Sequence, residues 1–114
     1  MYEELSKKLS SLFLRYLEYC NGSKTKEEFG EHYLPVVEFV LSNKFVISEK
    51  VNHISMEYLQ AIMIDGDSKD QARVKLNSTV NAMRSELGLS VIDIIEQFSK
   101  MESLFENTRK FFGK

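Results

Sequence analysis

The chain contains a single cysteine, Cys20, so no disulfide can form within it. That is typical of proteins from reducing compartments, and we expect a cytoplasmic protein. Cys20 also falls on an apolar helical stripe, where a small buried side chain is expected rather than a reactive thiol.

Long apolar runs are also missing. The longest, Leu59–Ile64, is interrupted by Gln60 and is too short to span a bilayer. The N-terminus is acidic and amphipathic, and it lacks the basic start and apolar stretch of a signal peptide. We therefore predict no membrane association.

Neither half of the chain is a block of positive charge. The 15 basic and 17 acidic residues give a net charge of −2, and each half holds one more acid than base. Proteins that bind nucleic acid usually concentrate positive charge, because phosphate contacts supply much of their affinity. We therefore predict that nucleic acid is not the partner.

Helix breakers are few, with one proline and five glycines among 114 residues. Apolar residues recur at steps of three and four, which predicts five helices at about residues 2–20, 25–41, 48–64, 69–87 and 90–112. Short connections favour antiparallel neighbours. We predict an all-α fold: a compact antiparallel bundle of four to five helices that forms a single domain over residues 1–114.

Three local signals mark helix boundaries or irregularities. Thr25 and Glu28 have the spacing of a capping box at the start of the second helix. Gly88 is placed to end the fourth helix. Pro35 lies inside the second helix, where it removes one N–H donor and crowds the preceding turn, so we predict a kink or break near Tyr33–Leu34.

The two histidines do not have the spacing of a bundle metal site. His32 lies four residues after Glu28, and His53 lies four residues from both Glu49 and Glu57. Di-iron sites of helical bundles use a Glu-x-x-His step of three, with further glutamates on other helices. We predict no bound metal and no cofactor.

Motifs of nucleophilic catalysis and of phosphate binding are also missing. Neither histidine is close in sequence to Cys20, and no serine lies in a Gly-x-Ser-x-Gly turn. The chain has no glycine-rich phosphate-binding loop. We predict that the protein is not an enzyme.

Residues 80–98 have the pattern of a helix-turn-helix and provide the alternative function, that of a DNA-binding regulator. Arg84 stands where the packing of the two helices favours a small residue, and the second helix offers Asp93 and Glu96 to DNA. The alternative nucleic-acid face is the basic side of the fourth helix, formed by Lys69, Arg73, Lys75 and Arg84.

Apolar side chains outside the main helical stripes favour a protein partner. They could be buried by packing across the bundle, or they could form a contact surface, and they are Leu14, Ile92, Leu104, Phe111 and Phe112. Heptad-spaced stripes on the first and fifth helices suit pairing with a second copy. We predict a non-catalytic protein that acts by protein–protein interaction, as an adaptor, inhibitor, chaperone or immunity-type protein, and that forms a homodimer.

Overall fold

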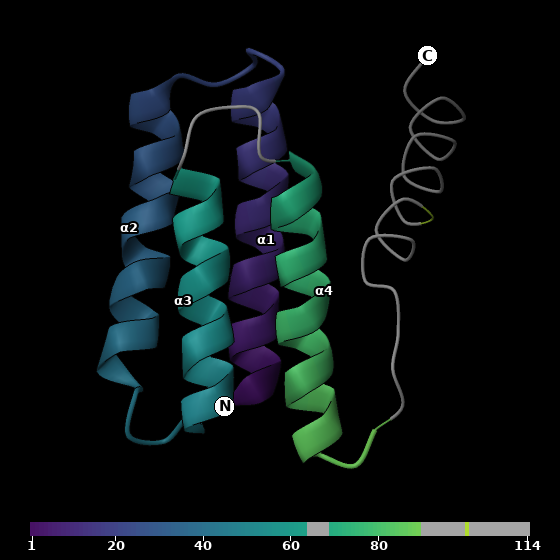
Figure 1. Ribbon diagram of the computed structural model, residues 1–114. Helices are drawn as coiled ribbons and strands as arrows, with labels where there is room; N and C mark the ends of the chain where they lie inside the picture. Colours follow the sequence, from purple (N-terminus) through teal and green to yellow (C-terminus); the bar gives the residue numbers. More distant parts are fainter. Residues whose placement is uncertain (64–68, 90–99, 101–114) are drawn as a thin grey trace, which may run out of the picture.

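A computed structural model describes residues 1–63, 69–89 and 100, and these contain four α-helices (Figure 1). The helices are α1 (Tyr2–Cys20), α2 (Lys26–Ser42), α3 (Glu49–Met63) and α4 (Lys69–Glu86). No strand occurs in these ranges, which confirms the all-α prediction for them. The fifth helix expected at 90–112 lies outside the described residues.

The four helices lie side by side, and successive helices run in opposite directions (Figure 1). Contacts join α1 to α2, α2 to α3, α3 to α4, and α4 back to α1. The helices therefore enclose a shared interior, which is where their apolar faces are buried.

The core follows the helical periodicity of the sequence. α1 buries Leu5, Leu9 and Leu12, which are spaced to lie on one face. The core is completed mainly by Val36 and Val40 of α2, Val51, Tyr58 and Ile62 of α3, and Leu76, Val80 and Met83 of α4. The buried Tyr58 hydroxyl donates a hydrogen bond to the Leu9 carbonyl at 2.9 Å, so it ties α3 to α1.

A cluster of aromatic rings fills the interface between α1 and α2. Phe29 lies at its centre, with ring centroids 5.9 Å from Tyr16, 5.6 Å from Tyr19 and 5.7 Å from Tyr33. Such distances are typical of favourable ring pairs. Tyr33 also donates a hydrogen bond to the Leu59 carbonyl at 2.8 Å, which joins this interface to α3.

The predicted helix ends are confirmed at α2 and α4. Glu28 N–H donates to the Thr25 hydroxyl at 3.1 Å, and Thr25 N–H donates to the Glu28 carboxylate at 3.0 Å. These bonds form the capping box, and the bond from Thr25 N–H to the carboxylate is the main cause that lowers the pKa of Glu28. Gly88, just after α4, has a φ of 74°, a value that favours glycine. The N–H of Leu89 donates a hydrogen bond to the Arg84 carbonyl at 2.8 Å and so closes the end of the helix.

α2 continues through Pro35 without interruption, so the helix does not break there. Pro35 is exposed on the outer face of the helix. The expected kink near Tyr33–Leu34 stays a prediction.

Candidate functional site

Most of the apolar residues proposed for protein contact lie outside the described part of the chain. These are Ile92, Leu104, Phe111 and Phe112. Leu14 is described, and it is half-buried on α1. The described part of the chain therefore contains one member of this set, and the contact surface stays a prediction.

The basic residues of α4 do not form one continuous strip. Lys69 and Arg73 are exposed, but Lys75 is partly buried and its Nζ lies 3.2 Å from a carboxylate oxygen of Glu57 on α3. Arg73 and Lys75 are separated by about 200° around the helix, so they face different sides. The helix-turn-helix interpretation extends to residue 98, beyond the described residues.

Neither histidine takes part in a metal-binding cluster within residues 1–63, 69–89 and 100. His53 Nε2 lies 3.1 Å from Glu57 Oε1, while the other oxygen of Glu57 contacts Lys75. Glu57 therefore contacts both His53 and Lys75 at the surface.

α2 and α4 finish at the same end of the molecule (Figure 1), and exposed apolar residues lie at or just beyond both helix ends. We call this surface the apolar end. It consists of Leu41 (52% exposed), Phe45 (91%), Val46 (65%), Leu87 (59%) and Leu89 (50%). Phe45 and Val46 lie in the tight turn between α2 and α3, in which Val46 N–H and Ile47 N–H both donate to the Asn43 carbonyl. Ile47, the next residue, is buried and anchors this turn to the core.

Hydrogen bonds among Tyr2, Ser48 and Glu86, which we call the polar junction, connect the turn between α2 and α3 to the end of α4. Tyr2 at the start of α1 and Ser48 before α3 each donate a hydroxyl hydrogen bond to the Glu86 carboxylate, at 2.5 Å. Ser48 N–H also donates to the Tyr2 oxygen at 3.3 Å, and the Ser48 hydroxyl accepts from Val51 N–H at the start of α3. The hydroxyl bonds from Ser48 and Tyr2 lower the pKa of Glu86. The turn carrying Phe45 and Val46 is therefore fixed relative to the end of α4.

No known protein family, curated protein or solved structure matches this chain.

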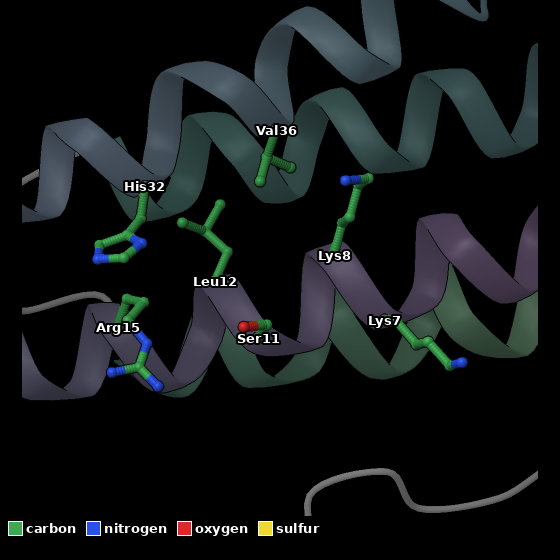
Figure 2. Close-up of a pocket in the computed structure, with 7 residues that line it drawn as sticks. All are labelled: Lys7, Lys8, Ser11, Leu12, Arg15, His32 and Val36. Atoms are coloured by element: carbon green, nitrogen blue, oxygen red, sulfur yellow. The ribbon is translucent and has the colours of Figure 1, made fainter.

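A second surface feature is a groove of about 230 Å³ between α1 and α2, which we call the basic groove (Figure 2). It is lined by Lys7, Lys8, Ser11, Leu12 and Arg15 of α1 and by His32 and Val36 of α2. Figure 2 shows Leu12 of α1 and Val36 of α2 extending toward the opposite helix, so they form an apolar floor. Among the described lining residues, every charged side chain is basic.

Each α1 cation of the basic groove contacts a glutamate of its own helix, and Lys8 also contacts the Phe39 ring of α2. The Nζ of Lys7 lies 3.3 Å from Glu3, the Nζ of Lys8 lies 4.0 Å from Glu4, and Arg15 Nη1 lies 2.6 Å from Glu18. Such exposed pairs each stabilise a protein by about 0–1 kcal/mol. Lys7 and Lys8 are therefore available to a ligand at little cost, whereas Arg15 is held in a half-buried pair with Glu18.

Both surfaces were missed by the sequence-based interpretation. Exposure of Leu41, Phe45 and Val46 depends on which neighbouring helices cover them, and no local sequence pattern reveals that. The basic groove combines residues of two helices, so no single stretch of sequence contains it. The spacing of Lys7, Ser11 and Arg15 at steps of four was the one available signal, because it places them in a line on α1.

Within the described residues, none of the helices combines the length and the apolar character needed to cross a bilayer.

Proposed function

We propose that this chain acts by binding another protein and that the apolar end is the contact surface. The observation that carries the proposal is the exposure of five apolar side chains at one end of the molecule, with Phe45 91% exposed. Burying a phenylalanine or leucine side chain is worth about 1.5–3 kcal/mol, and clustered exposed apolar residues often mark contact sites. The ordered turn supports binding, because a fixed surface loses little conformational freedom when a partner docks.

We also propose a role, a compartment and an assembly for the protein, each of which the sequence predicts. The protein would be a non-catalytic adaptor, inhibitor, chaperone or immunity-type protein of the cytoplasm, built as an antiparallel bundle with a kink in α2 near Pro35. It would also form a homodimer through the helix expected at 90–112. The packed helices and the exposed apolar end are compatible with any of these roles.

Capture of partners from the native host tests the proposal. Tagged wild-type protein is compared with the double variant Phe45→Ser, Val46→Ser and with the control Leu34→Ser, which changes a residue of α2 that is 62% exposed and outside the apolar end. We expect the double variant to lose a partner that the control retains, with both variants showing the wild-type far-ultraviolet circular dichroism. An identical set of captured proteins for all three forms would contradict the proposal.

A further inference from the structure

We propose that the basic groove between α1 and α2 binds an acidic peptide segment of the protein partner, with carboxylates on its cations and an apolar side chain on its floor. The inference rests on the proposed function, because it names the chemistry of the protein that is bound. It concerns a different surface from the apolar end, so the two can be tested separately.

The arrangement of charge favours an extended acidic ligand. The chain as a whole has a net charge of −2, yet three cations of α1, Lys7, Lys8 and Arg15, line the groove. Figure 2 shows Lys8 extending toward α2, whereas Lys7 and Arg15 extend away from it along the edge of the groove. Lys7, Ser11 and Arg15 follow one another at steps of four along α1, which spreads them over about 12 Å. An extended peptide covers that distance with about four residues, so two of its carboxylates can reach Lys7 and Arg15.

The side chains of the groove are suited to carboxylates. The guanidinium of Arg15 can hold a carboxylate with two parallel hydrogen bonds. The ammonium group of Lys8 lies 4.9 Å from the centre of the Phe39 ring, a contact that restrains it beside the groove. The exposed Ser11 lies between the cations and offers a hydroxyl donor.

The size and floor of the groove favour a peptide over other anions. Its volume of about 230 Å³ is smaller than the roughly 300–1,000 Å³ typical of sites for complete small-molecule ligands. Leu12 (2% exposed) and Val36 (8% exposed) present a small apolar floor that an aliphatic side chain would contact and that an inorganic anion would leave unused. Nucleic acid would require a longer series of cations along its phosphates.

A titration followed by ¹⁵N–¹H correlation spectra tests the inference. The full chain is titrated with a short peptide of alternating Glu and Leu and, separately, with the matching peptide of alternating Gln and Leu. We expect the acidic peptide to shift the amides of Lys8, Ser11, Arg15 and His32, and the neutral peptide to bind at least about tenfold more weakly. We also expect affinity for the acidic peptide to fall as salt is raised.

Charge reversal locates the binding site. Arg15→Glu should weaken binding of the acidic peptide by about tenfold or more, and Lys8→Gln should weaken it less, since it removes a charge without reversing it. The matched control is Arg73→Glu, an exposed arginine of α4 outside the groove, which should leave affinity within about twofold. Amide spectra of each variant without peptide report whether the fold is retained, and Lys8→Gln serves if Arg15→Glu fails to fold.

Several results would overturn the inference: absence of binding by the acidic peptide, equal binding of the two peptides, or equal losses for Arg15→Glu and Arg73→Glu. Inorganic phosphate that shifts the same amides while the acidic peptide does not would also overturn it. The Phe45→Ser, Val46→Ser protein should bind the acidic peptide as wild type does. A further outcome is that the wild-type protein fails to bind the acidic peptide while the Phe45→Ser, Val46→Ser variant still loses the captured partner. That combination would reject the groove and retain the apolar end as the contact surface.

Discussion

At the scale of single residues, the structure depends on polar side chains that find partners inside an apolar interior. Tyr58 is fully buried between the helices, and its hydroxyl reaches the Leu9 carbonyl. Burial raises the pKa of Tyr58, with a further contribution from neighbouring Tyr16, so this phenol stays neutral and keeps its proton for the hydrogen bond.

Replacement of this hydroxyl should reduce stability. Tyr58→Phe removes the bond to Leu9 while keeping the ring, so we expect a loss of about 0.5–1.5 kcal/mol in the free energy of unfolding. Tyr19→Phe is the control, because its ring is only partly buried and stacks on Phe29 without depending on the hydroxyl. Urea unfolding followed by circular dichroism measures both. Equal stability of Tyr58→Phe and wild type would show that the bond contributes nothing.

Helix boundaries were the most predictable part of the structure. The end of α1 and the capping box of α2 were identified correctly because each depends on a few neighbouring residues. Burial was less predictable, because an apolar pattern does not reveal whether a neighbour covers it. Leu41 belongs to the apolar pattern of α2 and is nevertheless 52% exposed. The basic groove was unpredictable for the same reason, since it depends on how α1 and α2 pack.

The junction of Tyr2, Ser48 and Glu86 predicts a pH-dependent stability. Hydroxyl bonds from Ser48 and Tyr2 lower the pKa of Glu86 below its ordinary value of 4.5. A carboxylate whose pKa is lowered by folding stabilises the folded state above the ordinary value, and this contribution is lost as the pH falls through the lowered pKa.

We therefore expect Glu86→Gln to be less stable than wild type at pH 7, and the difference to shrink as the pH falls below 4.5. Tyr2→Phe should make the pH dependence shallower, because it removes one of the two hydroxyl bonds. Urea unfolding at a series of pH values provides the measurement. A difference between wild type and Glu86→Gln that is the same at every pH would refute this role of the junction.

Pro35 destabilises α2, because it lies inside the helix. Proline inside a helix is about 3 kcal/mol less favourable than alanine, because it lacks an N–H and crowds the preceding turn. Pro35 is exposed, so alanine can replace it without leaving a cavity. We expect Pro35→Ala to raise the free energy of unfolding by about 1–3 kcal/mol, whereas the exposed neighbour Leu34→Ala should change it little. A destabilised Pro35→Ala protein would indicate that the helix geometry depends on the proline.

At the scale of the whole molecule, self-association is the first property to measure. We expect a dimer in light scattering at micromolar concentration, because the apolar stripe predicted for 90–112 and its off-stripe residues suit pairing with a second copy. The double variant Phe111→Ser, Phe112→Ser should shift the mass toward the monomer. A monomeric mass for both proteins would exclude the dimer and leave the apolar end to a different partner.

The central claim is that the apolar end contacts a partner protein, and hydrogen exchange of the chain alone and in complex with a captured partner tests it most directly. Amides in the exposed turn at 43–46 and at the end of α4 should exchange faster in the free chain than core amides do. We predict that the partner slows exchange at residues 41–47 and 86–89, while exchange in the exposed first turn of α2 stays unchanged. Protection confined to other parts of the chain, with residues 41–47 and 86–89 unaffected, would contradict the account.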